Sequence, residues 1–126
     1  KCKNNIISWR QSTNACFSYI QFLLWHTRNN YILGLSAIFP CFFIYKEIAQ
    51  KFYPVENPSP YIDWFDTYSS ESFVNQNKTI IKMINREYDN SNKNTKKIML
   101  EIIEQGCLLE WQFWDDAYHQ KQFCPI

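Results

Sequence analysis

The stretch YILGLSAIFPCFFIYKEIAQKF, residues 31–52, decides the fold of this chain. Through residue 44 it is apolar around most of a helical circumference, and then it becomes increasingly polar. A helix that is apolar on all sides has to be buried. We therefore predict a central helix over residues 31–52. Its most apolar part, 32–44, is shorter than the about 20 residues that cross a membrane, so we expect no membrane contact.

Pro40 stands inside this predicted helix, directly before Cys41. Proline removes one backbone hydrogen bond and its ring crowds the preceding turn, so we expect a kink or a break there. After a break, the first amides of the new helical segment would point towards the thiol. Such amides favour a thiolate, which predicts a lowered pKa for Cys41.

Outward from this stretch, helical spacing and capping residues predict four more helices. They cover about residues 14–28, 59–68, 70–88 and 95–120, with loops at 53–59 and 89–94. The first is expected to stop at Asn29-Asn30, and the second to begin with Ser59 as its cap and Pro60 in its first turn. The fold class is therefore all-α, a helical bundle in a single domain over residues 1–126.

The composition supports this fold class and excludes one class of partner. With 126 residues the chain has the size of one domain, and its 18% aromatic residues with only 2 glycines favour helices over hairpins. A formal charge of +1, from 13 basic and 12 acidic residues, leaves no basic face for nucleic acid. Five cysteines without zinc-ligand spacing indicate neither a disulfide framework nor a metal site. Because residues 1–10 lack the apolar core of a secretory signal, we expect a cytoplasmic protein.

Two residues stand out as candidates for chemistry. Cys41 and Tyr45 are four positions apart and so share one helical face, although a buried cysteine also serves as a small apolar side chain. Glu110 interrupts the apolar stripe of the last helix. A carboxylate there needs a partner or a functional pocket, unless its side chain reaches solvent at the edge of the stripe.

Other polar and aromatic side chains are weaker candidates. Four tyrosines offer ring faces and hydroxyls for a flat ligand, although each also fits a structural core: Tyr19, Tyr45, Tyr61 and Tyr68. His26 shares a helical face with Tyr19 and is a possible base or a packed histidine. His119 is expected to be solvated, and Asp115-Asp116 to be an exposed pair.

Four ordered segments together resemble the TenA, or thiaminase II, family. They are YIQFL at residues 19–23, FPCFFIYKEI at 39–48, PYIDWFDTY at 60–68 continued by SESF at 70–73, and EWQFWDDAY at 110–118. The resemblance runs from about Asn14 to Tyr118. It covers only the C-terminal portion of the family's domain, which implies a haem-oxygenase-like helical bundle here lacking the N-terminal helices.

The resemblance implies a function and assigns roles to residues. Cys41 would be the nucleophile, and Glu110 the acid/base or a hydrogen-bonding carboxylate for the pyrimidine ring. Tyr19, Tyr45 and Tyr68 would be substrate-binding residues. The implied activity is that of an aminopyrimidine aminohydrolase that releases hydroxymethyl pyrimidine in thiamin salvage, with an aminopyrimidine or thiamin as substrate. It requires no metal or other cofactor, and the family often forms homotetramers. A non-catalytic binding protein for pyrimidine or thiamin-like ligands, and a purely structural helical domain, stay open as alternatives.

Overall fold

The computed structural model describes residues 12–54 and 59–121, and in this part of the chain every regular element is an α-helix. The helices are α1 (Asn14–Asn29), α2 (Tyr31–Phe52), α3 (Ile62–Ser69), α4 (Glu71–Asn90) and α5 (Lys93–Tyr118). The predicted all-α fold class is confirmed, with the five helices in the expected order. Residues 1–10, on which the expected absence of a secretory signal rests, and the middle of the 53–59 loop lie outside the described residues.

Short polar side chains set the starts of four of these helices. Thr13 accepts the amide of Cys16 at the start of α1. Asn30 ends α1 and caps α2, where its side chain accepts two amides. Ser70 and Asn92 cap α4 and α5 in the same way. Each cap satisfies amides that have no partner inside the helix, so the stop expected at Asn29-Asn30 is confirmed.

Two predicted boundaries are wrong by a few residues. The short helix α3 begins at Ile62, because Ser59 does not cap it but accepts the amide of Tyr61 at 3.2 Å in a preceding turn. The last helix begins at Lys93, since Asn92 accepts the amide of Thr95 at 2.9 Å and draws the polar residues 93–94 into the first turn.

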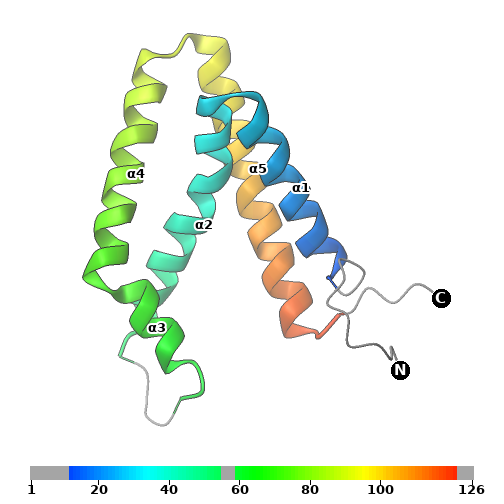
Figure 1. The fold of residues 1–126 in the computed structure, drawn as a ribbon, viewed down its shortest axis with the longest axis vertical. Helices are drawn as coiled ribbons and strands as arrows, with labels where there is room; N and C mark the ends of the chain where they lie inside the picture. The colour runs from blue at the N-terminus through cyan, green and yellow to red at the C-terminus, as the bar shows by residue number, and fades with distance from the viewer. Residues whose placement is uncertain (1–11, 55–58, 122–126) are drawn as a thin grey trace, which may run out of the picture.

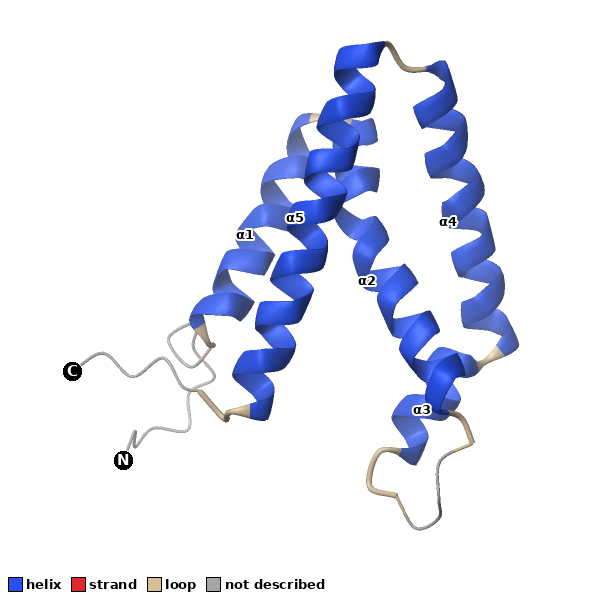
Figure 2. Cartoon of the chain, turned by 180° about the vertical axis from the view of Figure 1, so that it is seen from behind, coloured by secondary structure: helices blue, strands red, loops and turns tan. Residues whose placement is uncertain are grey.

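Helix α2 is central, as predicted. In Figures 1 and 2 it runs between α4 on one side and the α1–α5 pair on the other, and it contacts each of the other four helices. Two apolar clusters lie along it. One joins Tyr19 and Phe22 of α1 to α5, and the other joins Ile84 of α4 to Met99 of α5.

The membrane expectation for this helix needs a correction. Among the described residues, α2 with its 22 residues is long and apolar enough to span a membrane by length and composition. The most apolar part, 32–44, is too short on its own to cross a membrane, and for this reason no membrane contact was expected. The core helix of a globular domain meets the same criteria, and α2 packs against four other helices here.

The expected break at Pro40 is absent, because α2 continues through this residue. The proline is buried, and its ring lies beside Gly106 of α5. A Cβ atom added at Gly106 would lie 2.8 Å from Cγ of Pro40. Gly106 therefore allows α5 to approach α2 closely, which brings the middle of α5 beside the turn of α2 that follows Pro40.

Replacing Gly106 with alanine is expected to lower the free energy of unfolding by about 1–2 kcal/mol. The added methyl group crowds the rigid ring of Pro40. This overpacking destabilises the folded state by more than the higher helix propensity of alanine stabilises it. Chemical denaturation followed by circular dichroism measures the change. Gln105→Ala, at an exposed position of the same helix, is the control and should change stability by less than about 0.5 kcal/mol. A Gly106→Ala variant as stable as the parent would contradict this view of the contact.

Candidate functional site

The carboxylate of Glu110 lies inside the bundle, with only 1% of the residue exposed. The hydroxyl of Tyr19, from α1, donates to its Oε1 atom across 2.6 Å. Its Oε2 atom is buried and has no hydrogen-bond partner among the described residues. The alternative in which Glu110 reaches solvent is thus excluded, and one oxygen remains ready to accept a further donor.

Burial raises the pKa of both Glu110 and Tyr19. Loss of solvent raises the pKa of Glu110, while interactions with the Tyr19 hydroxyl and the Cys41 thiol act in the opposite direction. Burial likewise raises the pKa of Tyr19, and the adjacent negative charge of Glu110 adds to the rise. A carboxyl group with a raised pKa can take up and return a proton nearer neutrality than an exposed one.

Cys41 is half-buried on α2 and interacts with the same carboxylate. Burial, followed by the negative charge of Glu110, raises the pKa of Cys41 to about 12. The prediction of a lowered pKa is therefore wrong. Because α2 is continuous through Pro40, no free helix amides reach the sulfur, and its surroundings favour the protonated thiol.

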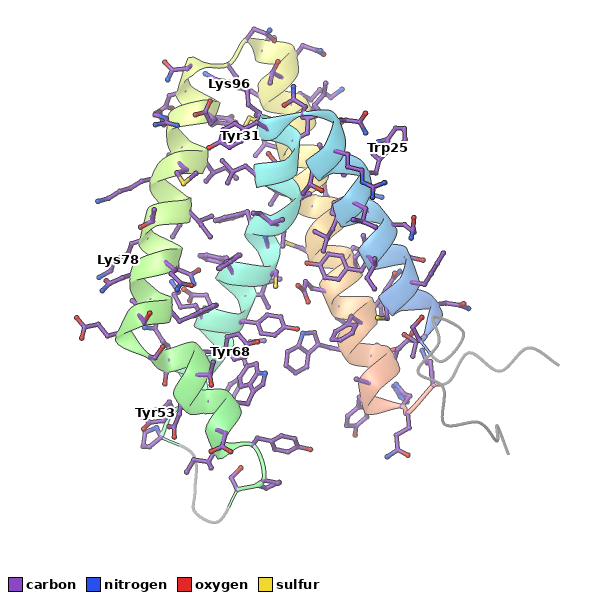
Figure 3. The ribbon with its side chains drawn as sticks, in the orientation of Figure 1. Trp25, Tyr31, Tyr53, Tyr68, Lys78 and Lys96 are labelled. Carbon is purple, nitrogen blue, oxygen red and sulfur yellow. The ribbon has the colours of Figure 1, made fainter. Side chains whose placement is uncertain are left out.

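Tyr45 and Tyr68 form the aromatic side of the site. Tyr45 lies one turn beyond Cys41 on α2, and its ring centroid is 4.9 Å from that of Tyr68. Figure 3 marks Tyr68 where α3 meets the C-terminal half of α2. Burial, together with the charge of Glu110, raises the pKa of Tyr45, so its hydroxyl keeps its proton at neutral pH.

The structure brings all five predicted site residues together from four helices. Tyr19 comes from α1, Cys41 and Tyr45 from α2, Tyr68 from α3 and Glu110 from α5. The Tyr19 hydroxyl donates to Glu110, the charge of Glu110 acts on both Cys41 and Tyr45, and the ring of Tyr45 contacts that of Tyr68. Tyr61, which is exposed, is not among these interacting residues.

The remaining candidates have other roles. His26 packs edge-on against Phe22 with ring centroids 4.7 Å apart, and burial lowers its pKa, so it is a packed histidine. The expectation of an exposed Asp115-Asp116 pair is wrong, because Oδ2 of Asp116 accepts the amide of Ala15 at 3.2 Å and joins the start of α1 to the end of α5. Within residues 12–54 and 59–121, no group of three or more His, Cys, Asp or Glu is arranged to hold a metal ion.

The profile of the TENA/THI-4/PQQC family matches residues 3–120, nearly the whole chain. The chain belongs to this family. The family assignment suggested by the four motifs is therefore confirmed.

Several members of the family are similar in sequence or in structure. The aminopyrimidine aminohydrolase of Bacillus subtilis is 28% identical over 93 residues, which are 73% of this chain and 39% of that enzyme. The thiamine biosynthesis multifunctional protein ThiED of Corynebacterium efficiens is 28% identical over 105 residues, 82% of this chain and 14% of that protein. A solved TenA homologue from P. horikoshii superposes with a TM-score of 0.76 at 29% identity, over 86% of this chain and 51% of that chain.

The chain thus spans about half the length of the solved TenA homologue, and less of the other two relatives. What it shares with the TenA homologue is a helical bundle, in accordance with the fold predicted from the motifs.

Sequence reasoning missed two tryptophans that border the candidate site. The ring of Tyr45 lies 5.7 Å from that of Trp64 and 5.5 Å from that of Trp114, so both indoles border the aromatic side of the site. Each stands inside one of the four quoted segments, and the four-residue spacing of Trp114 from Glu110, which puts both on one helical face, is the signal that could have found it. An indole carries no titratable group, so in the sequence these two residues look like ordinary core aromatics.

Proposed function

We propose that this chain provides the active-site residues of an aminopyrimidine hydrolase that releases hydroxymethyl pyrimidine. One observation carries the proposal: a buried carboxylate, Glu110, is held by the Tyr19 hydroxyl, keeps one oxygen without a partner, and interacts with the Cys41 thiol. A nucleophile, an acid/base and a proton donor within one interior cluster are what covalent catalysis on a basic heterocycle requires.

Glu110 is proposed to act first as a base and then as an acid. Its raised pKa makes it a better proton acceptor than an exposed carboxylate, which compensates in part for the high pKa of Cys41. The thiol proton moves to Glu110 as the sulfur attacks a ring carbon of the pyrimidine. The protonated Glu110 then donates to a ring nitrogen, where negative charge develops.

The later steps restore the enzyme. In the covalent adduct the bond between the exocyclic methylene and its nitrogen substituent breaks, and the electron pair leaves with that nitrogen, which departs as ammonia from an ammonium group or as a neutral thiazole from thiamin. Water adds to the methylene and gives a proton to the Glu110 carboxylate, forming the hydroxymethyl group. The carbon–sulfur bond then breaks with its electron pair on the sulfur, which takes the proton from Glu110, and the ring nitrogen releases its proton to solvent. Tyr45 and Tyr68 are proposed to stack on the pyrimidine ring and hold it in place.

A non-catalytic binding protein is the second candidate. The observation that favours it is the pKa of Cys41, raised to about 12, because a protonated thiol is a poor nucleophile. The two candidates separate in one assay: the chain is incubated with an aminopyrimidine or with thiamin, and release of hydroxymethyl pyrimidine is followed. Turnover supports the hydrolase, and binding without release supports the binding protein.

Because the chain spans about half or less of the length of its relatives, the activity of the whole protein is part of the proposal. A role in thiamin salvage agrees with the names of the relatives in Bacillus subtilis and Corynebacterium efficiens. The homotetramer, the cytoplasmic location and the assignment of residues 1–126 to the C-terminal portion of one domain stay predictions.

Replacing Tyr19 with phenylalanine is expected to move the acidic limb of the pH–rate profile to higher pH. The Tyr19 hydroxyl lowers the pKa of Glu110, so its loss lets that pKa rise further. The reaction starts from the Glu110 carboxylate, and the rate is therefore lost as pH falls through this pKa. The pH dependence of kcat/KM measures the shift, with Tyr118→Phe at a highly exposed position as the control. An acidic limb that stays in place would contradict the role of Glu110 as the base.

A further inference from the structure

The carboxylate of Asp116, near the end of α5, binds the start of α1. Its Oδ2 atom accepts the amide of Ala15 at 3.2 Å, although the two residues are 101 positions apart in the chain. The side chain of Thr13, which caps α1, also hydrogen-bonds to Asp116. Helix α1 has no acidic residue in its own first turn. Asp116 therefore supplies from another helix the negative charge that stabilises a helix N-terminus.

The neighbours of Asp116 keep it ionised and fix its orientation. Nζ of Lys121 lies 3.1 Å from Oδ1 of Asp116 and 2.7 Å from Oδ2 of Asp115. The hydrogen bond from Lys121 lowers the pKa of Asp116 most, and the bonds from Thr13 and Ala15 lower it further. Only 13% of the Asp116 side chain is exposed, against 29% for Asp115. One oxygen of Asp116 thus faces Lys121, while the other faces α1.

Apolar packing alone attaches the start of α1 weakly. The apolar cluster that joins α1 to α5 begins at Tyr19. Between residues 12 and 18, Ala15 is the one residue that is buried, and its side chain is a single methyl group. Figures 1 and 2 both show this start of α1 beside the end of α5. The hydrogen bonds of Asp116 therefore supply much of the attachment at this end.

The place of the Tyr19 hydroxyl depends on this attachment. Tyr19 follows Ala15 by four residues, so both side chains lie on the buried face of α1, about 6 Å apart along the axis. The hydrogen bond from Tyr19 to Glu110 spans 2.6 Å between buried groups. Such a bond depends steeply on distance and angle, so a shift of about 1 Å at the start of α1 would loosen it.

We propose that Asp116 is a positioning residue for the candidate site, because its bond to the start of α1 keeps the Tyr19 hydroxyl on the carboxylate of Glu110. This inference rests on the proposed function, in which Glu110 is the base. Asp116 does not touch the reacting atoms in this role, and it acts through α1. When Asp116 is removed, the bond from Tyr19 to Glu110 loosens and the pKa of Glu110 rises.

The direction of this change separates positioning from a direct effect of charge. Removal of the negative charge of Asp116 would by itself favour the Glu110 carboxylate and lower its pKa. Loss of the Tyr19 hydrogen bond instead removes an interaction that lowers the pKa of Glu110, so that pKa rises. Among the described residues, the other ionisable groups that interact with Glu110 are on α2 and α5: Cys41, Tyr45 and Cys107. None of the three lies on α1, the helix that Asp116 holds.

An NMR titration of Glu110 tests the proposal without turnover. The chain is isotope-labelled at the side-chain carboxyl carbon of glutamate, and the resonance of Glu110 is identified by its absence in Glu110→Gln. Asp116→Ala is expected to raise the pKa of Glu110 by about 0.5 or more. Asp115→Ala is the matched control, because Asp115 shares the Lys121 partner but is not hydrogen-bonded to α1, and it should change that pKa by less than about 0.2.

A double substitution shows whether the effect passes through Tyr19. In a chain that already has Tyr19→Phe, Asp116→Ala should cause no further rise in the pKa of Glu110. An equal rise in that chain overturns the proposal, and so does an unchanged or lowered pKa in Asp116→Ala alone. Circular dichroism reports the helix content of each variant. If Asp116→Ala loses helix content, Asp116→Asn takes its place. Its uncharged oxygen accepts more weakly, so a smaller rise is expected, and no rise overturns the proposal.

An assay of hydrolysis with the same variants separates this inference from the proposed function. If the chain releases no hydroxymethyl pyrimidine but the pKa of Glu110 rises in Asp116→Ala, the proposed function fails and the positioning role stands. If the chain is active and Asp116→Ala leaves both the pKa of Glu110 and the acidic limb of kcat/KM in place, the positioning role fails and the proposed function stands.

Discussion

Replacing Cys41 with serine is expected to reduce the release of hydroxymethyl pyrimidine by about 1,000-fold or more. The serine hydroxyl is far harder to ionise than a thiol, and Glu110 is too weak a base to deprotonate it. The substitution removes no large side chain from the half-buried position, so the fold is retained. Steady-state release of product measures the activity, and far-ultraviolet circular dichroism measures the helix content.

Cys107 provides the matched control for this experiment. It is a free and exposed cysteine on α5, so Cys107→Ser should keep the activity of the parent chain. If Cys41→Ser is as active as Cys107→Ser, Cys41 does not form the covalent bond and the proposed mechanism is wrong. A loss of helix content in Cys41→Ser would show that the substitution disturbs the fold. Cys41→Ala, which has neither a thiol nor a hydroxyl, is then measured in the same way. If it keeps the helix content of the parent and is inactive, the missing nucleophile is responsible.

Replacing Glu110 with glutamine is expected to lower the rate by about 100-fold to 10,000-fold. The amide keeps the size of the side chain and can still accept from the Tyr19 hydroxyl, but it cannot take the proton of Cys41. The loss should appear in kcat, since the pyrimidine can still enter. Glu104→Gln, at an exposed position of the same helix, is the control and should leave the rate unchanged. A Glu110→Gln variant with the rate of the parent would contradict the acid/base role.

The same variant should be more stable than the parent at neutral pH, by about 1–2 kcal/mol. Burial raises the pKa of Glu110 in the folded state above its value in the unfolded state, so the folded state favours the protonated carboxyl group. The stabilisation that results is fully present at pH values below the unfolded pKa. That contribution is lost as pH rises through the folded pKa, when a buried carboxylate with one unpartnered oxygen remains. Chemical denaturation at pH 4 and pH 8 should show the advantage of Glu110→Gln growing with pH. If the stability advantage of Glu110→Gln over the parent shrinks as pH rises, the raised pKa of Glu110 is contradicted.

Most of the fold could be predicted from the sequence because its signals are local. Asn30 and Ser70 cap helices with their own side chains, and the run 31–44 is apolar around most of its circumference, which predicts a central, buried position. Glu110 could be found for the same reason, since a carboxylate on an apolar stripe conflicts with its surroundings. The boundaries at Ser59 and Thr95 were wrong because Ser59 accepts the amide of Tyr61 in a turn before α3, and because Asn92 caps α5 so that the helix begins at Lys93.

What the sequence could not provide depends on contacts between distant helices. Pro40 does not break α2, and its ring packs beside Gly106, a residue 66 positions further along the chain. The high pKa of Cys41 follows from burial and from the charge of Glu110 on another helix. Likewise, Asp116 meets the amide of Ala15 only because α1 and α5 lie side by side. None of these pairs is visible as a pattern within one segment.

The central claim, that Cys41 forms the covalent bond, is tested most directly by trapping the adduct. The chain is mixed with an aminopyrimidine substrate, quenched in acid during turnover, digested with trypsin and examined by mass spectrometry. Cleavage after Arg28 and Lys46 gives a peptide of residues 29–46 in which Cys41 is the only cysteine, while Cys16 and Cys107 lie in other peptides. We expect the mass of the pyrimidine fragment on the peptide 29–46. Turnover with that peptide unmodified, and the label on Cys107 or on no cysteine, would contradict the account.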